Sequence, residues 1–391
     1  MSSTLAIFAA LFLRDTHAQN PGRLEQVYAE QDRAATAPFV GITTSGTVLP
    51  GLFQRASAGA PTTAIRQAVE AFLNTLDAKQ RTRIVFPVED ETQWRRWHNA
   101  GVLLPQGMSF AEMSESQREA AVGLLRASLS TAGLREATGI MRLNQVLADL
   151  TPDAQTRRPL PFGQWAYWIA IMGMPSVTEP WGWQVEGRHL AINYLILGDQ
   201  VVMTPTFMGA EPVRADSGVF AGTAVLQRKQ DTAVTLFTSL DARQKARAVI
   251  RTAKGPEESL AGAFADNLVL DYAGIPGSDL TRPQRRLLED VIAQYVGDMD
   301  EGHARVKMRE VRRHLDSTYF AWIGNADPVG VFYYRLQSPV ILIEFDHTPA
   351  RDPGLPRNHI HSVVRTPNGN DYGLDLLRQH YAVHRHATIA R

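Results

Sequence analysis

The chain has 391 residues, with 40 Lys and Arg against 40 Asp and Glu, and it contains no cysteine. This balance lacks the surplus of basic residues with which nucleic-acid-binding proteins neutralise phosphates, and no basic run marks a membrane-binding segment. The missing cysteines exclude disulfide scaffolds, zinc ribbons, iron–sulfur clusters and thiol nucleophiles. We therefore expect a soluble globular protein that acts on a small molecule, with no nucleic-acid or membrane partner.

The first apolar run of the chain lies near its beginning, at residues 5–13. It is too short to cross a bilayer, which takes about 20 residues. Thr16-His17-Ala18 is similar to a signal-peptide cleavage site, but no basic residue precedes the run and Arg14 follows it directly. These features favour a cytoplasmic protein whose chain begins with an amphipathic helix. Export by an atypical N-terminal signal is the alternative.

Two stretches of the chain repeat the same signals. Leu76-Asp77-Ala78-Lys79-Gln80 and Leu240-Asp241-Ala242-Arg243-Gln244 each follow an amphipathic run. Farther along each copy, Ser114 and Thr281 precede apolar residues at helical spacing, which is typical of helix N-caps. The first copy carries an extra helical segment over residues 134–150. The pattern predicts an internal duplication.

Each copy is predicted to end in antiparallel strands separated by turn residues. The expected strands are residues 183–196 and 201–208 in the first copy, and 318–323, 331–336, 340–347 and 359–366 in the second. Helices followed by antiparallel strands, given twice, predict an α+β fold of two similar halves packed as one pseudo-two-fold unit. The expected divisions are an N-terminal segment (1–60), a first half (61–215) and a second half (216–391), packed together as one globular unit.

The histidines gather towards the end of the chain, where eight of the 11 follow residue 300. His359 and His361 are two residues apart on a predicted strand, so both imidazoles point to one face and can bind one ion. The alternative is a pair of structural histidines bonded to carboxylates. If the two halves pack by their sheets, His189 of the first half is the expected third ligand.

Two carboxylates share one face of the strand predicted over residues 340–347. Glu344 and Asp346 lie opposite an apolar face, and burying them unpaired would be costly. They therefore need a metal ion or a basic partner, for which Arg357 and Arg365 are the candidates. We expect Glu344 as a further metal ligand, and Glu344 or Asp346 as a general base. A mixed histidine and carboxylate site suits zinc, iron, manganese or copper.

A third group of candidates surrounds the glycines at 182 and 187. Trp181 and Trp183 are expected to wall a small-molecule pocket, although tryptophans beside glycine turns more often belong to a core. Asn193 places a polar group on an otherwise apolar strand. Asn193 and Arg188 are further candidates for lining this pocket, and Arg365 or Arg188 is the candidate for binding an anionic group of the substrate.

Several of these motifs resemble one known family. They are Trp181-Gly182-Trp183-Gln184 with His189, residues 204–212, Ile343-Glu344-Phe345-Asp346-His347, and His359-Ile360-His361 through Tyr381. Together they resemble the domain of unknown function 3500 family over nearly the whole chain. That family tends to have Gly-His-His where this chain has Gly187-Arg188-His189. The resemblance implies a single evolutionary unit, and it carries no reaction.

The chain has no Walker loop, no Gly-x-Ser-x-Gly elbow and no His-Glu-x-x-His helix. We expect a metal-dependent enzyme on a small organic substrate, in which a metal-activated water attacks and a carboxylate takes its proton. One alternative is an iron- or copper-dependent oxidoreductase or oxygenase at the same site. The others are a metal-free acid–base enzyme using Glu344, Asp346 and His347, and a non-catalytic binding protein. The sequence leaves the metal, the substrate and the oligomeric state open.

Overall fold

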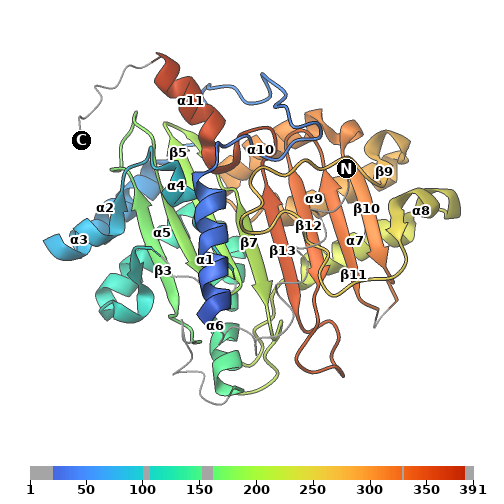
Figure 1. Ribbon diagram of the computed structural model, residues 1–391, viewed down its shortest axis with the longest axis horizontal. Helices are drawn as coiled ribbons and strands as arrows, with labels where there is room; N and C mark the ends of the chain where they lie inside the picture. The colour runs from blue at the N-terminus through green and yellow to red at the C-terminus, as the bar shows by residue number, and fades with distance from the viewer. Residues whose placement is uncertain (1–20, 100–105, 152–161, 328–329, 384–391) are drawn as a thin grey trace.

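The computed structural model describes residues 21–99, 106–151, 162–327 and 330–383. Within these residues, one mixed sheet of 13 strands crosses the whole molecule (Figure 1). Its continuous path runs β1-β3-β4-β5-β7-β13-β12-β11-β10-β8, and β2, β6 and β9 pair beside it. The strands are β1 (Val85–Phe86), β2 (Met108–Ser109), β3 (Tyr167–Met172), β4 (Trp181–Gly187), β5 (Leu190–Leu197), β6 (Gln200–Val202), β7 (Thr206–Ala210), β8 (Val249–Arg251), β9 (Ile275–Pro276), β10 (Tyr319–Gly324), β11 (Phe332–Gln337), β12 (Leu342–His347) and β13 (Ile360–Arg365).

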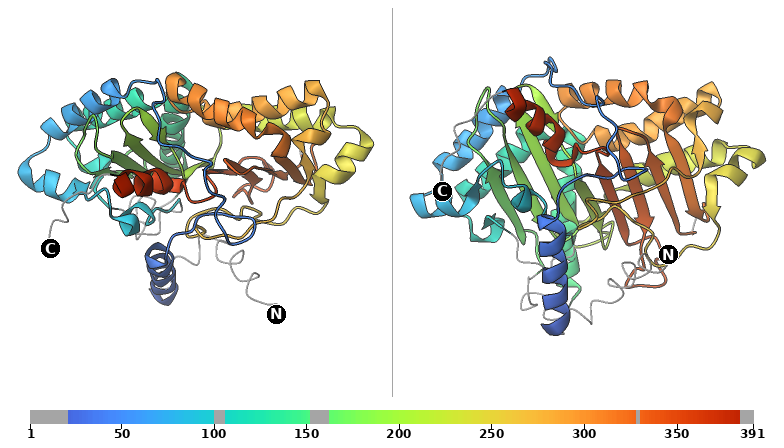
Figure 2. Two further views of the ribbon diagram at one scale, coloured as in Figure 1. Left: turned by 90° about the horizontal axis from the view of Figure 1, so that it is seen from above. Right: turned by 45° about the horizontal axis from the view of Figure 1, so that its top comes forward.

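Helices cover one face of this sheet, as the left view of Figure 2 shows. They are α2 (Thr63–Asn74), α3 (Ala78–Ile84), α5 (Glu115–Ser128), α6 (Thr131–Asp149), α7 (Gln227–Ser239), α8 (Ala242–Ala248), α9 (Arg282–Val296) and α10 (Glu301–Arg313). In α2, Ile65, Val69 and Phe72 recur at helical spacing and are buried in the larger core with strand residues such as Ile192 and Ile343. Each such side chain contributes about 1.5–3 kcal/mol on burial. We call this side the helix face.

Loops and three further helices cover the opposite side of the sheet, which we call the loop face. The helices are α1 (Pro21–Thr36), α4 (Glu91–Trp94) and α11 (Leu374–Val383). A second buried cluster lies here, including Trp97, Leu342, Val363 and Tyr372. The segments 37–55 and 254–271 meet on this face, where the Thr43 N–H bonds to the Leu268 carbonyl at 3.0 Å. α+β is thus the observed class.

The order of elements in the first part of the chain recurs in the second. When α4 and β6 are left out, the series α2, α3, β1, β2, α5, α6, β3, β4, β5, β7 is followed by α7, α8, β8, β9, α9, α10, β10, β11, β12, β13. In the sheet, β1 pairs parallel with β3, as β8 does with β10, and β7 meets β13 at the centre. The extra helix expected in the first copy, α6, is matched in this order by α10, which was not predicted.

The predicted N-caps Ser114 and Thr281 are confirmed, and both belong to capping boxes. Each box is joined to a second one that begins the short helix before it. The Gln117 amide donates to Gln80 Oε1 at 3.0 Å, and the Gln284 amide donates to Gln244 Oε1 at 2.8 Å. The repeated Asp-Ala-Lys/Arg-Gln motif is therefore a helix start whose glutamine ties two helices together.

Replacing Gln284 by alanine is expected to lower the free energy of unfolding by about 2 kcal/mol. The buried side chain of Gln284 is hydrogen-bonded to the Ser239 carbonyl, the Thr281 N–H and Gln244, and each of these groups would lose that hydrogen bond. Urea unfolding measures the change. Gln294→Ala on the same helix is the control, since Gln294 makes a single exposed hydrogen bond. Equal effects of the two substitutions would contradict the role given to Gln284.

Two expected strands in the first half are wrong in their bounds. Residues 183–196 form β4 and β5, which a two-residue turn at Arg188 and His189 separates. Likewise, residues 201–208 divide into β6 and β7 around Pro205, which has no N–H to donate to a ladder. β3 was not predicted. The strand faces were predicted correctly for β12, where Ile343 and Phe345 lie in the helix-face core and Glu344 and Asp346 point to the loop face.

The apolar run at residues 5–13 lies outside the described residues. Of the helices that are described, none combines the length and the apolar character needed to span a membrane.

Candidate metal centre

Three histidines meet where strands β5, β7 and β13 lie side by side. His189 occupies the β4–β5 turn with a positive φ of 62°, and its N–H and C=O bond to the Asn99 carbonyl and the Gly209 N–H, both at 2.8 Å. His359 precedes β13, and His361 lies within it, directly opposite Gly209 of β7. A Cβ at position 209 would lie 3.1 Å from the His361 ring and 2.6 Å from the Ile360 carbonyl oxygen. Glycine therefore allows this close approach.

The ring nitrogens of His189, His359 and His361 lie within 4.8 Å of one another, close enough for one metal ion. The Nε2 atoms of His189 and His359 are 3.1 Å apart. Two lone pairs at that distance repel unless a proton or a cation lies between them. Nε2 of His361 is buried and has no hydrogen-bond partner among the described residues. We call this cluster the histidine triad.

The outer nitrogens of two rings already have acceptors. Nδ1 of His359 lies 2.9 Å from the Pro349 carbonyl, and Nδ1 of His361 lies 3.4 Å from Glu257 Oε1. An acceptor at Nδ1 holds the proton there and leaves the Nε2 lone pair free, which is the arrangement of metal-bound histidines in proteins. The side chains of His359 and His361 are 13% and 12% exposed, so these two rings are in partial contact with solvent.

The surroundings of the triad favour uncharged imidazoles. Burial lowers the pKa of His359 and of His361 to about 3, and it lowers the pKa of His189 well below its ordinary value. The positive charge of Arg188 lowers all three pKa values further, and neighbouring rings of the triad also lower the pKa values of His189 and His359. All three rings are therefore neutral at pH 7, the form in which histidine binds metals.

Carboxylates flank the triad on both sides. Glu257 contacts His361, and burial raises the pKa of Glu257 to about 7. Glu211 Oε2 lies 3.8 Å from Nδ1 of His359. Asp346 is the direct cross-strand neighbour of His361, and it forms an ion pair with Lys254 at 2.7 Å. Burial raises the pKa of Asp346 to about 7 as well.

The chain matches the family described as "Protein of unknown function (DUF3500)" over residues 58–374. It belongs to this family. No curated protein and no solved structure shows significant similarity to it. The matched range contains the whole histidine triad, together with Glu211, Glu257 and Asp346. The family description names no reaction, so only the residues of this DUF3500 protein indicate its chemistry.

Glu344, expected as a ligand or base, is not part of the cluster that brings the three histidines together. Its buried carboxylate accepts the Tyr333 hydroxyl at 2.5 Å and the backbone N–H groups of Leu260 and Ala261. Burial raises its pKa. The hydrogen-bond partners of Glu344 are therefore a hydroxyl and backbone N–H groups, and not the expected Arg357 or Arg365. Glu344 holds the segment 254–271 against the sheet, and this segment supplies Glu257 to the triad.

Arg365, expected to bind substrate or take part in catalysis, is completely buried between two carboxylates. Its guanidinium lies 2.6 Å from Asp266 Oδ1 and 2.9 Å from Asp371 Oδ2. Arg95 pairs with the other oxygen of Asp266 at 2.9 Å, and the Tyr372 hydroxyl donates to Asp266 at 2.9 Å. The structure thus places Arg365 in an ion-pair network within the loop face.

The expected pocket residues are divided between the two faces. Trp181 and Trp183 are buried in the helix-face core, where Trp183 stacks on Tyr194 with the ring centroids 4.9 Å apart. Asn193 points to the loop face and bonds to Gln184 and to the Pro205 carbonyl. Arg188 alone of this group lies near the triad, as its effect on the three histidine pKa values shows.

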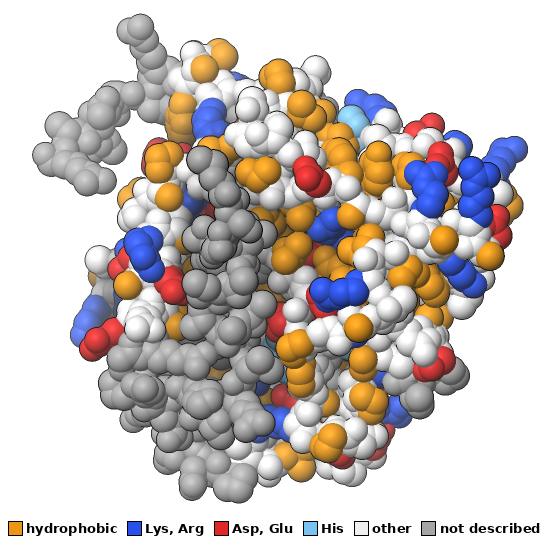
Figure 3. Space-filling model, turned by 45° about the vertical axis from the view of Figure 1, so that its right-hand side comes forward, with side chains coloured by type: hydrophobic (Ala, Val, Ile, Leu, Met, Phe, Trp, Pro, Cys, Tyr) orange, Lys and Arg blue, Asp and Glu red, His pale blue; other side chains and the backbone are white. Residues whose placement is uncertain are grey.

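Sequence reasoning did not find Glu211 or Glu257. Each lies in a loop beside a proline, so neither strand alternation nor helical spacing marks it. Glu211 falls within a segment that resembles the family, and that was its only sequence signal. The charges on the visible surface give no comparable signal, because basic and acidic side chains are interspersed there (Figure 3).

Glu186, a partly buried carboxyl on the loop face, predicts how stability depends on pH. Burial raises the pKa of Glu186 to about 7, although it accepts the N–H groups of His98 and Gln106. Between about pH 4.5 and 7 the folded state therefore holds a proton that the unfolded state has lost, and stability falls as pH rises.

Glu186→Gln keeps a neutral side chain at every pH. We expect the stability of the wild type relative to this variant to fall by about 3 kcal/mol from pH 4.5 to pH 7. Urea unfolding at a series of pH values measures the difference, which cancels the titration of other groups. A difference that does not change with pH, or that grows in favour of the wild type, would contradict the buried neutral carboxyl.

Proposed function

We propose that this protein is a metal-dependent enzyme in which Nε2 atoms of His189, His359 and His361 hold one transition-metal ion. The observation that carries the proposal is the convergence of three neutral imidazoles, two of which have an acceptor at the outer nitrogen. Three protein ligands leave the fourth position of a tetrahedral ion open for water, as in catalytic rather than structural zinc sites. Zinc, iron, manganese and copper all accept imidazole ligands, and zinc suits a three-histidine set best.

The proposed reaction is hydrolysis of a small organic substrate. A bound ion lowers the pKa of its water towards about 7, which supplies a nucleophile at neutral pH. Asp346 stands beside His361 on the neighbouring strand, and it is the carboxylate that we assign as proton acceptor. Glu257 orients the His361 ring. Arg188 is the cation assigned to an anionic group of the substrate, since its charge acts on all three histidines.

Elemental analysis of protein purified without a histidine tag tests the proposal. We expect close to one transition-metal ion per wild-type chain and its loss from His359→Ala/His361→Ala. His314→Ala is the control and should retain the ion, because His314 lies at the end of α10, outside the triad. The identity of the bound metal also decides which assays follow: hydrolytic assays for zinc, and oxygen-dependent assays for iron or copper. Wild type that stays empty after reconstitution with each metal would contradict the proposal.

We also infer that the two halves of the chain arose by duplication and pack about an approximate two-fold axis. The recurring element order, the paired capping boxes and the central β7–β13 contact support this. The triad then combines His189 of one half with His359 and His361 of the other, a common place for a ligand site. Superposing β3, β4, β5 and β7 on β10, β11, β12 and β13 in an experimental structure tests the duplication. Counterparts that fail to coincide would exclude it.

A further inference from the structure

A cavity of about 790 Å³ lies on the helix face, between α10 and the central strands of the sheet. Ser362 and Val364 of β13 line it. His361 directly precedes Ser362 on the same strand and therefore points to the opposite face. The cavity is thus a different place from the histidine triad. Its volume lies within the range of small-molecule sites in proteins.

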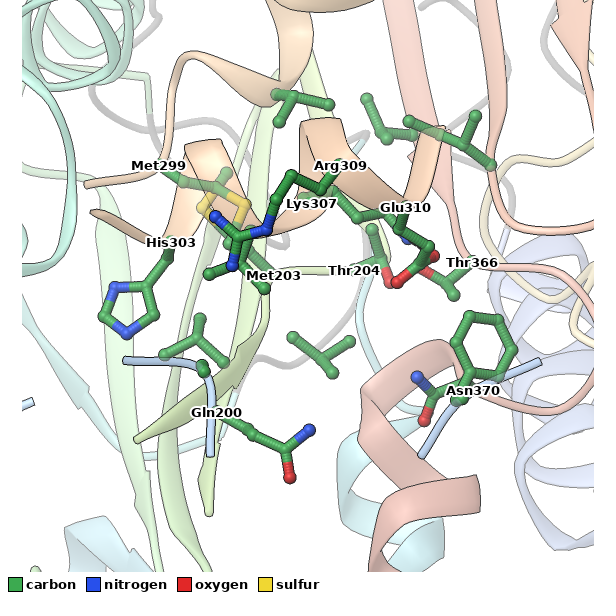
Figure 4. A pocket seen from close by; sticks show the side chains of 18 of the residues that line it. Gln200, Met203, Thr204, Met299, His303, Lys307, Arg309, Glu310, Thr366 and Asn370 are labelled. Atoms are coloured by element: carbon green, nitrogen blue, oxygen red, sulfur yellow. Dashed lines mark hydrogen bonds and ion pairs between the residues drawn. The ribbon is translucent and has the colours of Figure 1, made fainter. Parts of the chain in front are cut away.

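The inner wall of the cavity is largely apolar. Met208 of β7 lines it, with Met203 and Ile341 from the loops beside β6 and β12, Met299 from the link between α9 and α10, and Leu376 from α11. Figure 4 shows Met203 and Met299 on the same side of the cavity as His303. Methionine side chains are flexible and polarisable, so such a wall adapts to apolar ligands of different shapes.

The charges that line the cavity leave a basic excess on α10. Lys229 pairs with Asp298 at 2.6 Å, and Lys307 pairs with Glu310 at 2.7 Å, so these four charges offset one another. Arg309 and Arg313 also line the cavity, one turn apart on α10. Within the described part of the chain, neither of them has an ion pair. These two exposed arginines therefore favour an anion in the cavity.

His303 adds a polar group inside the cavity. It is 2% exposed, and its Nε2 has no hydrogen-bond partner within the described residues. Asp300 Oδ1 lies 3.3 Å from the other ring nitrogen without hydrogen-bond geometry. A buried polar atom left unpaired costs about 1–3 kcal/mol, so a bound molecule that offers it a partner is favoured.

We propose that this cavity binds a small carboxylate with an apolar body. Arg309 and Arg313 bind the carboxylate, since a guanidinium matches its two oxygens. The methionine-rich wall takes the apolar body, and His303 pairs with a polar group or a water molecule carried in with it. This site does not depend on the proposed metal enzyme, because it uses other residues on the other face of the sheet.

Isothermal titration calorimetry with decanoate, kept below its micelle threshold, tests this proposal. We expect saturable binding that Arg309→Ala/Arg313→Ala weakens at least about tenfold, the loss of one good ion pair. Arg305→Ala/Arg312→Ala is the matched control, because it removes the same charge from the same helix away from the cavity. This control should bind decanoate as the wild type does. Decanol, with a similar chain and no charge, should bind at least about tenfold more weakly than decanoate.

Three outcomes would overturn the carboxylate site. They are the absence of saturable decanoate binding, equal affinities in the two double variants, and equal affinities for decanoate and decanol. Decanoate binding should also persist in His359→Ala/His361→Ala. Loss of decanoate binding in that double variant would place the carboxylate at the triad instead of in the cavity. This result therefore distinguishes a failure of the cavity proposal from a failure of the metal-site proposal.

Discussion

His361→Ala is expected to abolish metal retention while leaving the fold cooperative. The substitution removes one of three converging Nε2 atoms, and no other described residue offers a ligand atom within the cluster. Removing even an outer partner of a ligand typically costs 10–100-fold in affinity, so removal of the ligand itself should cost more than about 100-fold. Competition with a chromophoric chelator measures this affinity, and thermal unfolding of the metal-free protein checks the fold.

Glu257→Gln alters the outer partner of His361 instead of the ligand itself, so its metal affinity is compared with that of His361→Ala. The amide can still accept a hydrogen bond from Nδ1 of His361, but it lacks the carboxylate charge. We expect a loss of about 10-fold, smaller than that of His361→Ala. An His361→Ala protein that keeps the wild-type metal affinity would exclude His361 as a ligand.

Asp266→Ala is expected to lower the free energy of unfolding by about 3–5 kcal/mol, because it leaves buried arginines without their shared carboxylate. Asp266 bonds to both Arg365 and Arg95, and all three side chains are at most 2% exposed. Arg95 also donates to the carbonyls of Ala34 and Ala37, so it ties the end of α1 to this network. Loss of Asp266 should therefore loosen the attachment of α1 as well as the loop face.

Urea unfolding measures this effect, and Asp271→Ala is its control. Asp271 is exposed and lies in the same segment, so its replacement should change stability by less than about 0.5 kcal/mol. Where Asp266→Ala folds, it should retain the metal, since the network does not contact the triad. A destabilisation below about 1 kcal/mol would show that the buried network contributes little to stability.

Local signals in the sequence predicted the parts of this fold that depend on near neighbours. Ser114 and Thr281 mark helix starts because a cap needs only residues three positions apart. Alternation along residues 340–347 separated the buried carboxylates from the apolar face of β12. The β4–β5 turn was missed because neither Arg188 nor His189 is a typical turn residue, although Gly187 directly precedes them.

The candidate site depends on contacts between distant residues, and the sequence predicted it only in part. His359 and His361 share a strand, so their common face followed from alternation alone. His189 joins them only because β5, β7 and β13 are neighbours in the sheet, which no local pattern encodes. Glu344 and Arg365 have the residue types of a catalytic site, yet they hold loops and neighbouring side chains in place. Residue type alone does not distinguish these two roles.

The most direct test of the central claim is an anomalous diffraction map of crystals loaded with the metal that elemental analysis identifies. The account predicts one strong peak about 2.0–2.2 Å from each Nε2 of His189, His359 and His361, with a water molecule at the open position. A map from fully loaded crystals with no peak at the triad, or with the metal bound elsewhere, would contradict it.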